Sequence, residues 1–391
     1  MSDSDVVEIP TRRDIVKSGG AVVGGSLLAG CSGDDTSPSS NNTTASTTTS
    51  TESATADQSY SVTMEPVGEV EFDEVPESWL AMTAGYADMG IALGQQPPEG
   101  ITSTGRYHTH HYDDIPDISV NKEDILQLFD AGIDKELFYS LDVDLHVFDP
   151  NFLINRVENL DETDIAEIES NISPLIGNTI FSRQYSWHDG YPYYTMYEAF
   201  EKMAEVFQEQ ERYQAFVDLH DEVIGEVTER IPPESERPSV ATLMVVSEEP
   251  GEFYPFRIEQ GTGWKQWRDL GVKDGLAGTG TESFTASRAT MGYEALLEAD
   301  PDYLMLYGYE SMSASEFRDT FLTYLQNHEV GSRLTAVENG NVYRAGGFYQ
   351  GPIINLSLTE RAAKQLYPEE FDAGEQLYDR QRVANIINGD L

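Results

Sequence analysis

Short apolar runs alternate with segments of helical spacing in the part of the chain that follows residue 60. Residues 78–83 and 141–148 are apolar runs with turn-forming residues beside them, which indicates buried strands. Residues 85–94 and 121–130 have the pattern of amphipathic helices. Strands that alternate with helices in this way predict an α/β lobe with a largely parallel sheet.

The middle of the chain has a longer helical pattern. Residues 197–207 are expected to be helical, and residues 209–230 follow with apolar and aromatic side chains along one face. At 1.5 Å per residue the second helix extends about 33 Å, enough to span a domain. Pro232 and Pro233 end it, because proline cannot continue the hydrogen-bond pattern of a helix.

The α/β pattern then resumes in the last third of the chain. Strands are expected at residues 239–246, 303–307 and 341–343, and helices at residues 262–270, 293–298, 317–327 and 357–366. The aromatic segment 253–257 is interpreted as a loop. The predicted fold class is therefore α/β, with two lobes of mostly parallel sheet joined by a single long helix.

The N-terminus has the features of an export signal. Arg12 and Arg13 precede an apolar run of about fifteen residues, too short for a transmembrane helix and typical of a Tat-type signal. Cys31 follows Leu-Ala-Gly, which resembles the lipobox of bacterial and archaeal lipoproteins, where the cysteine is lipidated and becomes the first mature residue. We expect Tat export and a lipid anchor on the extracytoplasmic face of the cell membrane. An uncleaved anchor with an incidental cysteine is the alternative.

Composition excludes several classes of function. The chain has 69 acidic and 24 basic residues and a net charge of −45, so a nucleic-acid partner is not expected. Apolar residues make up 39% of the chain, which argues against acidic disorder and for a folded protein with the acidic surface of extreme halophiles. Cys31 is the only cysteine, so the folded part has no disulfide.

Several segments resemble, in order and spacing, the substrate-binding proteins of ABC importers for iron–siderophore complexes and cobalamin. They include residues 120–126, 291–304 and 366–369, and residues 336–343, which read Ala-Val-x-x-Gly-x-Val-Tyr. The resemblance implies two α/β lobes joined by one long helix, with the ligand cleft between the lobes. The expected organisation is signal and lipobox 1–31, Ser/Thr-rich tether 32–59, N-terminal lobe 60–195, linking helices 196–231, C-terminal lobe 232–371 and tail 372–391.

The resemblance also implies a function without catalysis: capture of an iron chelate, a ferric siderophore, and its delivery to the permease subunits of an ABC importer. Cobalamin, heme and a metal ion are alternatives of the same class. Aromatic side chains suit bulky organic ligands and arginine suits anionic oxygens. The candidate ligand-binding residues are Arg106, Tyr107, His108, Trp187, Tyr254, Arg257, Trp264 and Tyr349. For each of them, packing in the local core or pairing with a surplus carboxylate is the alternative.

The loop with His108, His110 and His111 leaves three interpretations open. Imidazoles are common ligands for transition metals, but the spacing matches no closed zinc pattern and no cysteine is available. Metal coordination, contact with an organic ligand and an exposed polar loop all stay open, and no metal or cofactor is assigned. A metal-dependent hydrolase that uses Asp113 and Asp114 is a minor alternative, and a structural surface protein is another.

Two similar segments, residues 121–126 and 292–297, each place a glutamate near an expected helix start, where the helix dipole favours an anion. These are Glu123 and Glu294. In the resembled family, a glutamate at each matching position projects from its lobe toward arginines of the two permease subunits. The alternative is that both are ordinary first-turn carboxylates.

Overall fold

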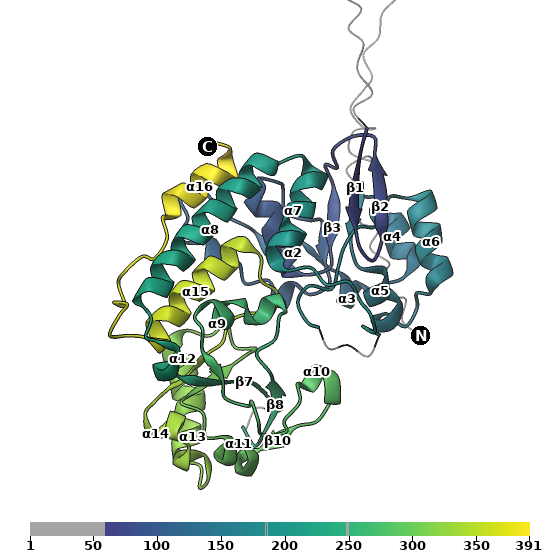
Figure 1. The fold of residues 1–391 in the computed structure, drawn as a ribbon. Helices are drawn as coiled ribbons and strands as arrows, with labels where there is room; N and C mark the ends of the chain where they lie inside the picture. Colours follow the sequence, from purple (N-terminus) through teal and green to yellow (C-terminus); the bar gives the residue numbers. More distant parts are fainter. Residues whose placement is uncertain (1–58, 184, 186, 248–249) are drawn as a thin grey trace, which may run out of the picture. The chain divides into compact units, whose positions relative to one another are not determined.

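The first lobe is built on a four-stranded parallel sheet with the order β5-β4-β3-β6. Figure 1 labels β3 of this sheet. The computed structural model describes residues 59–391, except residues 184, 186 and 248–249. The strands are β3 (Trp79–Ala81), β4 (Gly100–Ile101), β5 (Leu126–Gln127) and β6 (Leu145–Val147). The helices of this lobe are α2 (Ala84–Ala92), α3 (Leu128–Ala131), α4 (Lys135–Leu141), α5 (Pro150–Arg156) and α6 (Glu162–Asn171). The predicted export signal, Cys31 and the tether up to residue 58 lie outside the described residues.

A β-hairpin precedes this sheet and was not predicted. Strands β1 (Tyr60–Met64) and β2 (Gly68–Phe72) pair antiparallel, with Tyr60 opposite Phe72. Buried and exposed residues alternate along both strands, so one face of the hairpin packs on the core. Strand β1 contacts the linking helix α7 (Met196–Phe207), which is how the first residues of the folded part are held in place.

The segment expected to link the lobes forms two helices, close to the bounds expected for them. Helix α7 begins at a capping box in which Thr195 and Glu198 bond each other's backbone N–H groups. Helix α8 (Gln210–Arg230) buries the face formed by Phe216, Leu219, His220, Val223 and Val227, and it ends directly before Pro232. Its 21 residues confirm the expected long helix.

The second lobe has a mixed sheet with the order β10-β8-β7-β11-β12, and β9 pairs with β7 beside β8. The strands are β7 (Ser239–Val245), β8 (Glu252–Phe256), β9 (Lys273–Asp274), β10 (Met291–Gly292), β11 (Tyr303–Leu306) and β12 (Val342–Arg344). Strands β7, β11 and β12 run parallel, whereas β8 pairs antiparallel with β7 and with β10.

Strand β8 corrects the interpretation of residues 253–257 as a loop. Pro255 argues against a central strand, because proline has no N–H for a ladder. Strand β10 pairs only with Glu252 and Phe253, so Pro255 lies beyond the two β8 residues that β10 covers. Tyr254 and Phe256 therefore project from a paired strand, and not from a loop.

The segment 121–130 is a second correction. The expected helix is instead a 3-10 turn (Lys122–Asp124), the short strand β5 and the single turn of α3. Strand β5 pairs with β4 at the edge of the sheet. The backbone hydrogen bonds of this pairing therefore decide the structure here, although the apolar residues are spaced as in a helix.

After β8 the chain forms the helices α9 (Lys265–Asp269), α10 (Phe284–Ser287), α11 (Tyr293–Ala299), α12 (Ala314–Phe317), α13 (Thr323–Asn327), α14 (Thr335–Glu338), α15 (Pro352–Leu366) and α16 (Arg380–Asn388). Helices α9, α11, α13 and α15 overlap the expected helices, whereas α10, α14 and α16 were not predicted. A π-helical turn (Arg318–Leu322) joins α12 to α13. Helix α16 occupies the segment that was expected to be a tail, and it packs on α8 and α2.

Helix α15 belongs to both lobes, because it packs on α2 of the first lobe and on α9 of the second. It begins five residues before the expected 357, with Pro352 in its first turn, where proline is well tolerated. One hydrophobic core cluster runs from Trp79 in the first lobe to Trp264 and Tyr307 in the second. No helix of the described residues is long and apolar enough to cross a membrane.

Candidate functional site

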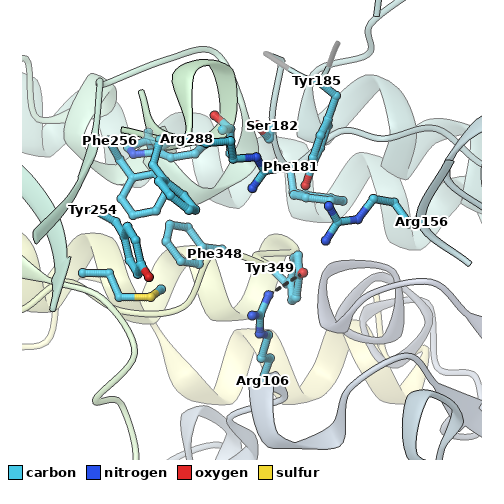
Figure 2. A pocket seen from close by; sticks show the side chains of 14 residues that line it. Arg106, Arg156, Phe181, Ser182, Tyr185, Tyr254, Phe256, Arg288, Phe348 and Tyr349 are labelled. Atoms are coloured by element: carbon cyan, nitrogen blue, oxygen red, sulfur yellow. Dashed lines mark hydrogen bonds between the residues drawn. The ribbon is translucent and has the colours of Figure 1, made fainter. Parts of the chain in front are cut away.

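A pocket of about 260 Å³ lies where the first lobe meets β8 and the segment after β12 (Figure 2). Its apolar lining is largely aromatic, from segments far apart in the chain. The aromatic lining residues are Phe181, Tyr185, Tyr254, Phe256, Trp264, Phe284, Phe348 and Tyr349. Such a wall suits a bulky organic ligand, which buries a large area against rings that lose little entropy.

Packing within the second lobe holds this wall in place. The Phe348 ring stacks on Tyr307, with centroids 4.1 Å apart, and meets Phe256 edge to face at 5.0 Å. The Tyr307 hydroxyl donates a hydrogen bond of 2.7 Å to the carbonyl of Gly263. Phe348 therefore lines the pocket from a fixed position, which limits the entropy that binding would cost.

Three arginines border the pocket, and Figure 2 shows their guanidinium groups turned toward it. Arg106 follows β4 and donates a hydrogen bond of 2.9 Å to the Tyr349 hydroxyl. Arg156 ends α5, with its guanidinium 5.9 Å from the Tyr185 ring centre. Arg288 follows α10 and lies 5.2 Å from the centre of the Phe284 ring.

None of these three guanidinium groups pairs with a carboxylate of the described residues. Six other arginines of the described residues do form such pairs. The paired ones are Arg212, Arg230, Arg257, Arg361, Arg380 and Arg382. In a chain with a net charge of −45, three arginines around one pocket without a carboxylate partner leave that pocket ready to accept anionic oxygens.

Tyr185 is close enough to all three arginines to interact with their charges. Burial, and after it the nearby Tyr349, raise the pKa of Tyr185 to about 12, while Arg156, Arg288 and Arg106 oppose that rise. The hydroxyl of Tyr185 therefore stays protonated at neutral pH and can donate a hydrogen bond to a ligand oxygen.

Four of the eight candidate ligand-binding residues come together in this pocket. They are Arg106, Tyr254, Trp264 and Tyr349. Residues that sequence reasoning did not select also line it. Tyr185 lies two residues before the candidate Trp187, and Phe348 directly precedes the candidate Tyr349, so the neighbours of these candidates were a usable signal. Arg156 and Arg288 carry no local signal, because neither lies in an aromatic segment of the sequence.

The other four candidates lie elsewhere. Tyr107 is fully buried, with its hydroxyl 2.8 Å from that of Tyr112. Trp187 does not line the pocket but stacks on the lining residue Tyr185, with ring centres 4.2 Å apart. Arg257 forms an ion pair with Asp274, with 2.6 Å between Nε and Oδ2. His108 is half-buried, and burial lowers its pKa to about 4.

The two docking candidates are exposed in different local settings. Glu294 lies in the first turn of α11, as expected. Glu123 lies in a 3-10 turn, where its backbone N–H bonds the Asn121 side chain. The helix-dipole argument therefore applies to Glu294 and is wrong for Glu123.

Comparison with known proteins agrees with this architecture. Residues 160–347 match the protein family described as "Periplasmic binding protein". The chain has the fold of the periplasmic binding proteins. No curated protein sequence matches it.

Solved structures of periplasmic binding proteins resemble most of the folded part. One from Veillonella parvula has a TM-score of 0.57 at 14% identity, and covers 79% of this chain and 98% of its own. Helicobacter pylori Ceue with Ni(II) bound has a TM-score of 0.55 at 12% identity, and the match covers 85% of this chain and 99% of Ceue. An ABC-type Fe3+-hydroxamate transport protein from Saccharomonospora viridis has a TM-score of 0.53 at 18% identity, and the match covers 79% of this chain and 99% of the other chain. At these identities the likeness establishes the fold.

Proposed function

We propose that the protein is an extracytoplasmic solute-binding protein that captures a ferric siderophore and delivers it to an ABC import permease. The observation that carries this proposal is the set of Arg106, Arg156 and Arg288 beside an aromatic wall, without carboxylate partners among the described residues. Iron chelators of this kind present anionic oxygens on a bulky organic frame. The arginines suit the oxygens and the aromatic rings suit the frame.

Two of the similar solved structures support an iron-bearing ligand, whereas Helicobacter pylori Ceue was solved with Ni(II) bound. The two are an iron uptake ABC transporter substrate-binding protein from Streptococcus pneumoniae, at 18% identity and a TM-score of 0.53, and the Fe3+-hydroxamate protein. Cobalamin is the second candidate for this chain, and heme and a metal ion follow. The pocket favours a chelate over cobalamin, because its three arginines would bind a ligand with anionic oxygens most strongly.

The test is a titration of the purified protein in molar salt with ferric hydroxamate, ferric catecholate and ferric carboxylate chelates, and with cobalamin and hemin. We expect one ferric class to bind with 1:1 stoichiometry, to raise the melting temperature and to undergo no turnover. Tight binding of cobalamin with failure of every ferric chelate would show that the ligand assignment is wrong.

Arginine variants connect this binding to the pocket. Arg156→Ala should weaken the ferric chelate about tenfold or more, which corresponds to about 1.4 kcal/mol or more. The matched control is Arg382→Ala, which removes an exposed arginine paired with Glu222 on another face, and it should leave the affinity unchanged. Equal affinity in both variants would remove Arg156 from the site.

The export and anchoring of the protein are part of the same proposal. Cys31 is proposed as the lipidated N-terminus of the mature protein, and the tether would let the folded part reach the permease from its anchor. Intact-mass analysis of the native membrane fraction should find a mature chain that begins at Cys31 and carries lipid. A mature chain that retains residues before Cys31 would contradict this.

A further inference from the structure

A second cavity, of about 520 Å³, shares no lining residue with the aromatic pocket. His110 and His111 border it from a 3-10 turn of the first lobe (Thr109–Tyr112), and Glu310 borders it from the segment after β11 of the second lobe. Among the described residues these three form the one group of histidine and carboxylate side chains arranged to hold a metal ion.

The spacing of the three donor atoms suits a tetrahedral metal ion. Glu310 Oε1 lies 3.3 Å from His110 Nε2 and 3.7 Å from His111 Nε2, and all three atoms lie within 4.8 Å of one another. Bonds of about 2.0–2.1 Å at tetrahedral angles place two donors about 3.3 Å apart. The His110 side chain is 43% exposed, so its ring has room to rotate into the site.

His111 is already oriented as a ligand. Its Nδ1 lies 2.8 Å from Ser357 Oγ on α15, while its Nε2 faces Glu310 and finds no hydrogen-bond partner among the described residues. The side chain is only 3% exposed, so water does not compensate for this. A histidine that is bonded at one ring nitrogen and free at the other, buried one is the arrangement in which imidazole binds metal.

Glu310 is held as an ionised carboxylate. Its side chain is fully buried, and Arg361 bonds both of its oxygens. Burial alone would raise the pKa of Glu310, but Arg361 and the hydrogen bond with His110 outweigh it, so the pKa is lowered. An outer hydrogen-bond partner of this kind orients a ligating carboxylate and leaves further oxygen lone pairs for a cation.

We propose that His110, His111 and Glu310 bind one divalent transition-metal ion of the zinc, nickel or cobalt class. Two imidazoles and one carboxylate suit such ions, whereas calcium and magnesium prefer oxygen ligands. The fourth position faces the cavity and takes water or a small ligand. Because two ligands come from the first lobe and one from the second, the ion would tie the lobes together away from the aromatic pocket. This site does not depend on the proposed chelate-binding function.

The test is equilibrium dialysis of the chelator-treated full chain against Zn2+ in molar salt, with Co2+ as a spectroscopic probe. We expect one equivalent of tightly bound Zn2+, a visible Co2+ spectrum of tetrahedral type and a higher melting temperature with either ion. His110→Ala should weaken Zn2+ binding at least about tenfold and abolish the Co2+ spectrum. Its ring is partly exposed, so the variant should still fold.

His108→Ala is the matched control, because it removes an imidazole from the same loop outside the three-atom cluster, and it should bind Zn2+ as the wild type does. Glu310→Gln gives a second variant that preserves side-chain size, and it should also lose the Co2+ spectrum. Tight 1:1 binding that survives in His110→Ala would overturn the proposal. So would weak uptake of many equivalents, which would come from the acidic surface and not from this site.

Discussion

Asp88 is the residue whose surroundings most clearly tie stability to pH. It lies on α2 with no exposed surface, and its carboxylate accepts hydrogen bonds from the Tyr112 hydroxyl at 2.6 Å and from the backbone N–H groups of Ile353 and Ile354. Burial raises the pKa of Asp88 to about 7, although these three donors oppose the rise. The Asp88 side chain on α2 thus caps the N-terminus of α15, and its burial there raises its pKa.

We therefore expect Asp88 to stabilise the fold less as pH rises. Its folded pKa is above the unfolded value of about 3.9, so its contribution is fully present below about pH 4 and is lost as pH rises through about 7. Between pH 5 and pH 8 the loss is on the order of 3 kcal/mol. Denaturant unfolding of wild type and Asp88→Asn at each pH measures it, and a pH-independent difference between them would mean that Asp88 stays ionised.

At the scale of elements, the close approach of α2 and α15 is the contact that joins the two lobes most directly. A Cβ atom at Gly351 would lie 2.6 Å from both Asp88 Oδ2 and the Gly85 carbonyl oxygen, closer than real Cβ contacts come. Glycine at 351 is therefore required by packing between the helices, and its backbone conformation is ordinary.

Gly351→Ala should lower the free energy of unfolding by about 1–3 kcal/mol, because the helices must separate to admit one methyl group. Gly225→Ala is the opposing control. A Cβ there meets nothing within 4 Å on the exposed side of α8, and alanine should stabilise the helix by about 0.5–1 kcal/mol. Urea unfolding compares the two variants, and equal stabilities would show that the α2–α15 contact is not tight.

The elements also show where sequence patterns succeed and fail. Helix α8 was predictable because its buried face repeats over 21 residues and prolines follow it. Strand β8 and the segment 121–130 were not, because a strand of two to five residues carries too little periodicity to outweigh a proline or a helical spacing. Helix α16 was missed because it follows a segment that looks like the end of the domain.

On the scale of the whole molecule, two helices limit how far the lobes can move. Helix α8 links them, and α15 packs on both. We expect ligand binding to produce only a small hinge closure. Small-angle scattering with and without the ferric chelate should give nearly equal radii of gyration, and a large compaction on binding would contradict this.

The docking proposal also belongs to this scale, because it needs one exposed carboxylate on each lobe. Glu123→Arg combined with Glu294→Arg should abolish uptake of the chelate by cells while the purified protein keeps its ligand affinity. Molar salt weakens exposed ion pairs, so shape and hydrogen bonds must contribute as well. Normal uptake by the double variant would refute the assignment, and lost ligand affinity would place these residues in the binding site instead.

The sequence by itself determined the fold class, the long linking helix, the acidic surface and the kind of residues that a ligand would meet. These follow from periodicity, composition and residue chemistry, which are local properties of the chain. Only the tertiary structure decided which arginines converge and which stay paired. Arg106 meets Tyr349 across 243 positions, and Arg156 and Arg288 join them from different lobes. Contacts between residues so far apart in the sequence depend on how the strands pair and the helices pack, so they cannot be predicted from a local pattern of residues.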